Sequence, residues 1–406
     1  MKVFLTRDKG TLSEEDIFLI AAEENVKIED LVDKNRNELI KRGYTVYYLC
    51  MKIEPRRQYL LDYDFPARLY QLPVDGLFEN EENVAFFKNL QSELHIDVVI
   101  NQRGLGGLFN SILSLTTTKL ISVIHSIPEA DVIIFINKLV ELTVPPFVAF
   151  KKFVKKTLPI INYYWKVKAI ADDKKKYKEL GHYSDAIVTL SNNDIKSLER
   201  FIEKAPCKAR ICSIPNPNTF DIIEEKPLCK EKMLLYVGRL TKSEKAPMRL
   251  LMIWKNLYKR FTDWRLVLVG DGNEKDNMLA YIKENNLSNV FFEGRQSDVA
   301  EYYKKASFVC LTSNFEGWGM ALTEGMQYGC IPFTFNNYGA AYEIIDDGVN
   351  GCLIPAFDLK KYASRLSELM SDDEKRSKMS VAAIEKVKMF SAEKIVDKWE
   401  RLLNSL

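Results

Sequence analysis

Short apolar runs rich in Val, Ile, Leu and Phe alternate with helix-forming segments along most of the chain. After residue 230 the alternation becomes regular, and runs such as KMLLYVG, RLVLVGDG and SFVCLTS are each followed by a helical pattern. A short run that is apolar throughout is typical of a strand covered on both faces, and strand–helix alternation favours a parallel sheet. The sequence therefore predicts an α/β fold of doubly wound, Rossmann-like sheets.

The chain has 406 residues, enough for two domains of the usual size of about 100–200 residues. A break falls at Pro215-Asn216-Pro217, which is followed by the acidic stretch Asp221–Glu225. We therefore predict a first domain over residues 1–215 and a second domain over residues 216–388. The first should contain strands over residues 2–6, 44–50, 97–103, 119–125, 186–190 and 210–218 and a mostly helical stretch over 129–180, and the second a helix over 247–261.

Composition excludes several classes of protein. The formal net charge of +2 argues against binding polyanions over the whole surface. The seven cysteines are odd in number and form no CxxC pair, which argues against a disulfide framework or a zinc site and fits a reducing compartment. MKVFLTRDKG lacks the apolar core of a signal peptide, and no apolar run approaches the ~20 residues that span a bilayer. We expect a cytoplasmic protein.

The stretch Glu316-Gly-Trp-Gly-Met-Ala-Leu-Thr-Glu324 places two carboxylates around glycines that lead into a helix. An apolar, β-prone run precedes it, so the stretch follows the carboxyl end of a strand, where open α/β sheets bind ligands. The free N–H groups of a helix start suit a phosphate, and carboxylates accept hydrogen bonds from sugar hydroxyls. The alternative is an acidic loop near a helix N-terminus, favourable through the helix dipole alone.

Two cations follow another strand of the second domain. Arg239 comes directly after KMLLYVG, and Lys245 lies in the same loop. Such a pair could hold a diphosphate, Arg as a fork and Lys as a point charge, although an isolated Arg/Lys pair is more often solvated surface. The loop Gly270–Glu274 fits a phosphate- or base-facing turn and a simple strand–helix turn equally well. His125 ends a strand of the first domain, where a histidine is more often structural than catalytic.

Other site patterns are missing from the sequence. There is no P-loop, no G-x-G-x-x-G after the first strand and no GxSxG elbow, and no His, Asp or Glu cluster has metal-ligand spacing. The stretch 150–168, FKKFVKKTLPIINYYWKVK, alternates lysine pairs with aromatic and aliphatic residues. That composition favours contact with an anionic membrane surface, against the alternative of an exposed basic helix packed by its aromatic face. We expect no nucleic-acid partner, because the basic patch is confined and no binding module is visible.

Several motifs together resemble the retaining glycosyltransferases of family 4, which have the GT-B fold. They are VGRL followed by a Lys, then LVGDG, FFEGR and EGWGMALTEG, and SDAIVTLS and ICSIPNP are similar to the stretch that joins the two domains of the family. The likeness covers residues 185–405 and, more loosely, 95–130. It implies two Rossmann-like domains that face a cleft. FSAEKIVDKWERLL resembles the family's last helix, so residues 389–406 are expected to cross back to the N-terminal domain.

The resemblance also implies roles for individual residues. Arg239 and Lys245 would bind the donor diphosphate and neutralise the leaving group, work that a metal does elsewhere, so neither a metal nor another cofactor is expected. Glu316 would contact the hydroxyls of the donor sugar, and Glu324 would hold the ribose hydroxyls of the nucleotide. His125 would lie beside the donor sugar and the reacting centre.

The remaining implied contacts are to main-chain groups and to the base. Backbone amides near Gly319, Met320 and Ala321 would support the sugar and the phosphate. Gly294 and Arg295 would lie near the base.

The sequence departs from the family after its first strand. Members of the family usually carry a glycine-rich loop there, whereas this chain has TRDKGTLSEED with one glycine, Gly10. Gly104, Gly106 and Gly107 follow a later strand and do not replace it. Three explanations stay open: this loop works differently from that of the family, the binding of the acceptor has diverged, or the activity is weakened.

The resemblance implies a metal-independent, retaining glycosyltransferase of the hexosyltransferase type. It would move a sugar from a nucleotide diphosphate sugar to a glycan or lipid-linked acceptor in cell-envelope polysaccharide synthesis, with peripheral contact to the inner face of the cell membrane. Two alternatives stay open. One is another GT-B nucleotide-sugar enzyme such as an epimerase, and the other is a non-catalytic partner subunit that keeps the fold.

Overall fold

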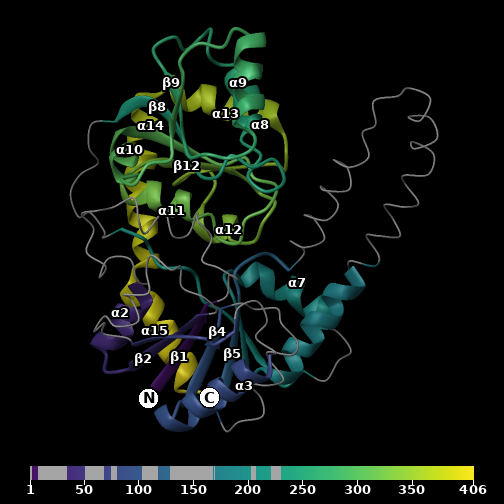
Figure 1. The fold of residues 1–406 in the computed structure, drawn as a ribbon. Coiled ribbons are helices and arrows are strands. Elements are labelled where there is room, and N and C mark those ends of the chain that lie inside the picture. The colour runs from purple at the N-terminus through teal and green to yellow at the C-terminus, as the bar shows by residue number, and fades with distance from the viewer. Residues whose placement is uncertain are drawn as a thin grey trace, which may run out of the picture. The chain divides into compact units, whose positions relative to one another are not determined.

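The computed structural model describes residues 2–7, 34–50, 68–74, 80–102, 118–128, 168, 170–202, 207–220 and 230–406 (Figure 1). Gly10 and its loop, Gly104–Gly107 and residues 150–167 of the lysine-rich stretch lie outside these ranges. The chain forms two compact units. Met1–Pro215 and Ile395–Leu406 make the first unit, and Asn216–Lys394 makes the second. The last segment thus joins the first unit from Ile395, six residues later than the sequence places the start of the crossing.

The first unit is built on a parallel sheet whose described strands follow the order β3-β2-β1-β4-β5-β6-β7. β4 and β6 are buried along their whole length, which explains why their sequences read as unbroken apolar runs. The strands are β1 (Lys2–Arg7), β2 (Thr45–Cys50), β3 (Arg68–Gln71), β4 (Val98–Asn101), β5 (Lys119–Ile124), β6 (Ala186–Thr189) and β7 (Arg210–Ser213).

Helices of the first unit include α2 (Lys34–Lys41), α3 (Glu81–Leu94) and α7 (Asn192–Ile202). Residues 170–183 are also helical, as the sequence predicts for the described end of that stretch. α3 begins at Asn80, whose side chain accepts a hydrogen bond from the N–H of Glu82, and it ends at His95 in the left-handed conformation with φ of 50°. An N-cap oxygen and a left-handed residue satisfy the polar groups that a helix end leaves unpaired.

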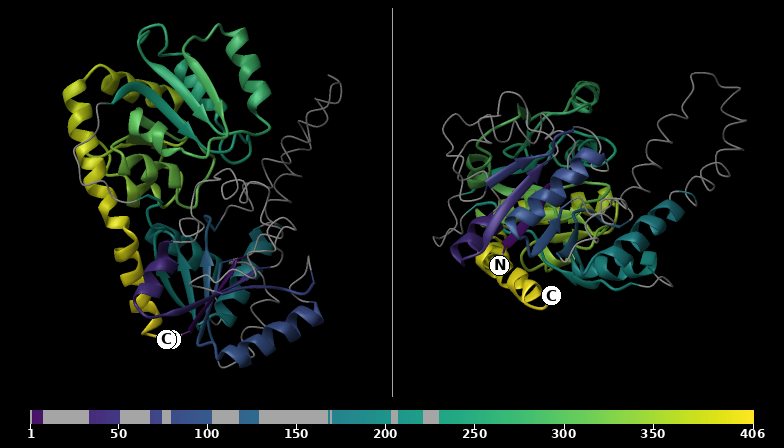
Figure 2. Two further views of the ribbon diagram at one scale, coloured as in Figure 1. Left: turned by 60° about the vertical axis from the view of Figure 1, so that its left-hand side comes forward. Right: turned by 60° about the horizontal axis from the view of Figure 1, so that its bottom comes forward.

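The final helix α15 (Ala392–Leu403) packs on the first sheet. Its apolar side chains lie among residues of α2, β2, β4, β5 and β6 in one core cluster, and Figure 2 shows α2 and α15 side by side. Arg42, next to the end of α2, donates to Asp397 at 2.7 Å and to Glu400 at 2.6 Å. The stripe that α15 buries is Ile395, Val396, Trp399, Leu402 and Leu403, the one-sided spacing of a core-facing helix.

The second unit is built on a parallel sheet in the order β10-β9-β8-β11-β12-β13. Because the chain runs outward from β8 on one side and from β11 on the other, the strand order reverses between these two central strands. The strands are β8 (Glu231–Val237), β9 (Arg265–Val269), β10 (Val290–Gly294), β11 (Ala306–Cys310), β12 (Ile331–Phe335) and β13 (Cys352–Ile354). The two parallel α/β sheets predicted from the alternation are confirmed.

The helices of the second unit are α8 (Met248–Trp254), α9 (Lys275–Glu284), α10 (Ala300–Lys305), α11 (Met320–Gln327), α12 (Ala341–Ile344), α13 (Leu359–Met370) and α14 (Asp373–Val387), with the 3-10 helix η3 (Lys388–Phe390). The helix predicted over 247–261 is too long. Beyond Trp254, hydrogen bonds between residues three apart, such as Leu257 N–H to the Trp254 carbonyl, interrupt the α-helical pattern. Its expected apolar face, Leu250, Ile253, Trp254, Leu257 and Phe261, is buried all the same.

No helix in the described ranges combines the length and the apolar character that crossing a membrane requires.

Candidate active site

The candidate site lies in the second unit, where the order of its strands reverses. The loop after β8 carries Arg239 and Lys245, and the loop after β11 carries Glu316. β8 and β11 are neighbouring parallel strands, so both loops leave the same edge of the sheet. This is the position outside the carboxyl ends of strands at which open α/β sheets bind ligands.

Lys245 and Glu316 form a buried ion pair. The Lys245 ammonium lies 2.9 Å from Oε1 and 2.8 Å from Oε2 of Glu316, and the Ser313 hydroxyl donates to Oε1 at 2.6 Å. The Glu316 side chain is 6% exposed and that of Lys245 is 25% exposed. A carboxylate this deeply buried needs a cation and hydrogen bonds to stay charged, and Lys245 and Ser313 supply both.

Two buried tyrosines stand near the Glu316 carboxylate. Burial, with the negative charge of Glu316 adding to it, raises the pKa of Tyr236 and of Tyr338 well above the ordinary tyrosine range. Tyr236 donates to the Arg239 carbonyl at 2.7 Å, and Tyr338 donates to the Thr334 hydroxyl at 3.2 Å. Both phenols therefore stay neutral beside the Glu316 carboxylate.

Arg239 starts the loop after β8 but does not join the buried pair. Its guanidinium, 48% exposed, contacts the carboxylate of Glu244 in the same loop. Arg239 is therefore more accessible to solvent than Lys245. Its guanidinium, which can donate two parallel hydrogen bonds, belongs to the same loop as the Lys245 ammonium.

The helix α11 begins behind the Glu316 loop. Gly319 precedes its first residue, Met320, in the left-handed conformation with φ of 91°, and no side chain caps this helix start. The left-handed conformation favours glycine, and a Cβ at Gly319 would also make a tight contact of 3.1 Å with the Tyr338 hydroxyl. The helix start, followed by Ala321, presents main-chain N–H groups of the kind that bind anions.

Glu324, just past the first turn of α11, has different partners from Glu316. The Thr219 hydroxyl donates to Oε1 and the Tyr303 hydroxyl to Oε2, each at 2.8 Å. Burial raises the pKa of Glu324, and the two hydrogen bonds counteract the rise. The structure therefore brings Lys245 and Glu316 together, whereas Glu324 is oriented by Thr219, which precedes β8, and by Tyr303 of α10.

Gly294 ends the outer strand β10, two strands away from β8, and Arg295 follows it. Gly294 accepts a hydrogen bond from Gly270 N–H at 2.7 Å, which ties the end of β10 to the loop after β9. Arg295 is exposed. These residues lie on the same sheet edge as the Lys245 and Glu316 loops.

The glycines of the loop Gly270–Glu274 are explained by packing. A Cβ at Gly270 would lie 2.0 Å from the Gly238 carbonyl oxygen, and a Cβ at Gly272 would lie 2.5 Å from that of Leu240. Leu240 N–H also donates to the Asp271 carbonyl at 2.8 Å. Of the two readings that the sequence leaves open, the close backbone approach of a strand–helix turn accounts for both glycines.

His125 lies in the first unit, directly after β5, and is exposed. Its Nε2 contacts the side-chain oxygen of Gln102, which follows the neighbouring strand β4. Gln102 thus orients the imidazole, a partner that the sequence does not reveal because the two residues are 23 positions apart. The place of His125 beside a donor sugar stays a prediction.

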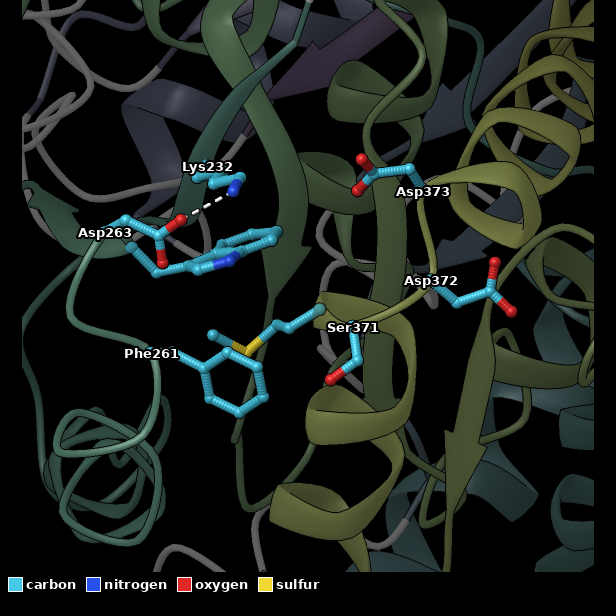
Figure 3. Close-up of a pocket in the computed structure, with 8 residues that line it drawn as sticks. Lys232, Phe261, Asp263, Ser371, Asp372 and Asp373 are labelled. Atoms are coloured by element: carbon cyan, nitrogen blue, oxygen red, sulfur yellow. Dashed lines mark hydrogen bonds and ion pairs between the residues drawn. The ribbon is translucent and has the colours of Figure 1, made fainter.

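A cavity of about 600 Å³ opens at the other edge of the second sheet. Figure 3 shows Lys232 and Asp263 on one side of it and Ser371, Asp372 and Asp373 on the other. Lys232 stands at the start of β8 and Arg239 follows its end, so the length of this strand of seven residues, roughly 20 Å, separates the two places. The cavity is therefore distinct from the predicted site.

Comparisons with known proteins bear on both units. The structure superposes on sucrose-phosphate synthase from Thermosynechococcus elongatus with a TM-score of 0.72, at 16% identity, covering 100% of this chain and 98% of that one. It superposes on Anabaena HepE, solved in complex with UDP and glucose, with a TM-score of 0.68 at 15% identity, covering 100% of both chains. The protein therefore has the GT-B fold of glycosyltransferases, as the sequence predicts.

Sequence comparison finds a family whose model matches part of the chain. Residues 219–386 match the family described as "Glycosyl transferases group 1". The match lies within the second unit.

Two curated relatives illustrate the match. The chain is 31% identical over 188 residues to "Amylovoran biosynthesis glycosyltransferase AmsD" of Erwinia amylovora, covering 46% of this chain and 51% of that protein. It is 27% identical over 222 residues, 54% of this chain and 60% of that protein, to the "GalNAc-alpha-(1->4)-GalNAc-alpha-(1->3)-diNAcBac-PP-undecaprenol alpha-1,4-N-acetyl-D-galactosaminyltransferase" of Campylobacter jejuni. The matches span about half to three-fifths of the length of these relatives.

Proposed function

We propose that the protein is a retaining glycosyltransferase that moves a sugar from a nucleotide diphosphate sugar to a glycan or lipid-linked acceptor. The observation that carries the proposal is the buried pair Lys245–Glu316, formed between two loops at the point where the strand order reverses. The pair places a cation for phosphate and an acceptor for sugar hydroxyls side by side. The UDP and glucose named for the Anabaena structure support a ligand of this class.

The residues of the second unit fit a division of work on the donor. Arg239 and Lys245 would meet the charge of the diphosphate, which grows as the sugar leaves, and this is electrostatic catalysis. Glu316 would accept from the sugar hydroxyls. Glu324, whose oxygens each hold one donor already, has lone pairs left for the ribose hydroxyls.

The remaining assignments concern the ends of the donor. The helix start at Gly319, Met320 and Ala321 would support the sugar and the phosphate, and Gly294 and Arg295 would lie near the base. These assignments rest on the family likeness and on the shared sheet edge.

Metal independence and retention are part of the proposal. Two cationic side chains on one loop can neutralise a leaving diphosphate, which is the work a divalent metal does in other transferases. Retention of configuration rests on the family likeness. Incubation of the enzyme with EDTA should leave transfer unchanged, and a product of inverted configuration would contradict the retaining mechanism.

The acceptor is proposed from the relatives. The curated names describe amylovoran biosynthesis and an undecaprenol-linked glycan. We propose an acceptor of the same class, a cell-envelope glycan or its lipid-linked precursor, met at the membrane surface through residues 150–168. Flotation with vesicles that contain an anionic lipid should carry the protein upward, and a variant with Lys151, Lys152, Lys155 and Lys156 changed to Gln should stay at the bottom.

A thermal-shift screen with UDP, GDP, ADP and their sugars tests the proposal. A ligand bound at 100 times its Kd stabilises the folded protein by about 2.7 kcal/mol. We expect one nucleotide series to raise the melting temperature of the wild type, to act weakly on Lys245→Ala and to act fully on Lys232→Ala, which removes an equal charge at the other sheet edge. No shift with any of these compounds would contradict the proposed donor class.

A further inference from the structure

Asn314 holds the loop that carries Lys245. Its main-chain N–H donates to the Glu244 carbonyl at 2.7 Å. Its side-chain Nδ2 donates to the Lys242 carbonyl at 3.1 Å and to the Ser243 carbonyl at 2.9 Å. One residue of the loop after β11 thus binds three consecutive carbonyls of the loop after β8, and the next residue of that loop is Lys245.

Two further side chains fix Asn314 itself. Arg249, at the start of α8, donates to the Asn314 side-chain oxygen at 2.7 Å and to the Thr312 carbonyl at 2.9 Å. Asn337, in the loop after β12, donates to the Asn314 carbonyl at 2.6 Å. Because the Arg249 guanidinium has only donors, it must face the side-chain oxygen of Asn314. The Asn314 Nδ2 group therefore points toward the carbonyls of the loop after β8.

Arg249 is held in place as well. Its guanidinium lies 4.5 Å from the centre of the Phe357 ring, a cation–π contact. Burial lowers its pKa, but an arginine stays charged in proteins. The network therefore joins the loops after β8, β11 and β12 at one asparagine, two residues before Glu316.

We propose that Asn314 is a positioning residue that sets the place of Lys245 relative to Glu316 and thereby the geometry of the diphosphate site. An amide is needed because it must donate to carbonyls and accept from Arg249 at once. Aspartate has the same shape but cannot donate, so two bonds to the loop are lost while the bond from Arg249 remains. The effect of Asn314 on binding of the donor diphosphate rests on the proposed function. Its effect on the position of the Lys245 loop does not.

A role limited to overall stability would give a different result. Asn289, at the other edge of the sheet, provides the matched control, because its side chain also donates to two main-chain carbonyls, those of Thr262 at 2.8 Å and Trp264 at 3.2 Å. Asn289→Asp removes the same number of bonds from the same unit. A general loss of stability would follow from either change, but a displaced Lys245 loop would follow from Asn314→Asp alone.

Hydrogen exchange and nucleotide binding test the proposal together. Amide exchange is measured by mass spectrometry over residues 238–247 in the wild type, N314D, N314S and N289D. Affinity is measured by calorimetry with whichever of UDP, GDP and ADP binds the wild type most tightly. We expect N314D and N314S each to raise exchange of this loop at least tenfold and to weaken nucleotide binding at least tenfold. N289D should do neither. Should N314D fail to fold, N314S, which introduces no charge, decides.

Several outcomes would overturn the proposal. They are unchanged exchange of residues 238–247 in both Asn314 variants, an equal rise in N289D, and raised exchange with unchanged nucleotide affinity. The double variant K245A/N314D adds a check, since it should bind the nucleotide no more weakly than K245A if Asn314 acts through Lys245. If the wild type bound none of the three nucleotides, the proposed function would be contradicted instead. The exchange data would then still decide whether Asn314 holds the loop.

Discussion

The two edges of the second sheet carry charges in different ways. At the carboxyl edge, Lys245 pairs with a Glu316 side chain that is 6% exposed. At the amino edge, Lys232 pairs with Asp263 beside the cavity of about 600 Å³, and these side chains are 48% and 58% exposed. An exposed pair is screened by water and contributes little, whereas a buried pair is held at a cost in desolvation. The comparison teaches that burial of paired charge marks the candidate site better than the size of an opening does.

The largest expected effect is on sugar transfer. Lys245→Ala removes a cation aimed at developing charge, and losing one such group typically lowers the rate on the order of 10²–10³-fold. Lys232→Ala should leave transfer unchanged, since it lies at the other end of β8. Release of nucleoside diphosphate from the donor measures both. Equal rates for the two variants would remove the distinction between the edges.

Stability should separate the same two lysines. Lys245→Met leaves the buried Glu316 carboxylate without its cation. Removing one partner of a buried pair typically lowers the free energy of unfolding by roughly 3–5 kcal/mol. We expect a loss near the lower end of that range, because Lys245 itself is partly exposed. Lys232→Met should change it by less than about 1 kcal/mol. Urea denaturation measures both, and a loss as large in Lys232→Met would show that exposure is the wrong criterion.

Most of the strands that position the site can be predicted from the sequence, for a physical reason. Buried parallel strands are apolar throughout, so β4, β6 and β11 can be predicted from their own residues. The residues that follow such strands lie at the edge of the sheet where ligands bind. The strand β3 is not predicted from the sequence, because RLYQ is short and half polar. The end of α8 at Trp254 depends on how the following turns pack, which has no local signal.

The contacts inside the site were less predictable. The positions of Lys245 and Glu316 follow from the loops that carry them, but their ion pair depends on which two loops meet. The same holds for Asn314, whose side-chain partners Lys242, Ser243 and Arg249 lie 65 to 72 residues away along the chain. Thr219 and Tyr303 were missed as partners of Glu324 because neither belongs to a motif. A single asparagine or tyrosine has no pattern until the fold brings its partner to it.

Two adjacent tyrosines of α10 extend the comparison of buried and exposed partners to Glu324. Tyr303 is fully buried and donates to Glu324, whereas Tyr302 is partly exposed and donates to Glu293 at 3.2 Å. Tyr303→Phe removes the donor from a partly buried carboxylate oxygen and should cost about 1–3 kcal/mol of unfolding free energy. Tyr302→Phe should change it by less than about 0.5 kcal/mol, as surface changes do. Similar losses in thermal denaturation would argue against burial as the cause.

The smallest effects are on pH dependence, and they have opposite signs. Burial raises the folded-state pKa of Glu324 above 4.5, so its contribution to stability is present below that pH and is lost as pH rises. The hydrogen bond from Lys232 lowers the pKa of Asp263 below 3.8, so its contribution is present above that pH and is lost as pH falls. Glu324→Gln should therefore gain stability relative to the wild type as pH rises from 4.5, and Asp263→Asn should gain relative stability as pH falls toward 3. Denaturation curves from pH 3 to 8 that shift in the same direction for both would contradict this account.

Nucleoside diphosphate binding tests the central claim most directly. UDP, GDP and ADP are titrated by calorimetry into the wild type, Lys245→Ala and Lys232→Ala. The loss of a charged hydrogen bond corresponds to about 1.5–3 kcal/mol, or roughly 10–100-fold in Kd. The account predicts that one of the three binds the wild type and Lys232→Ala equally well and binds Lys245→Ala at least tenfold more weakly. Equal binding to the wild type and Lys245→Ala would contradict it.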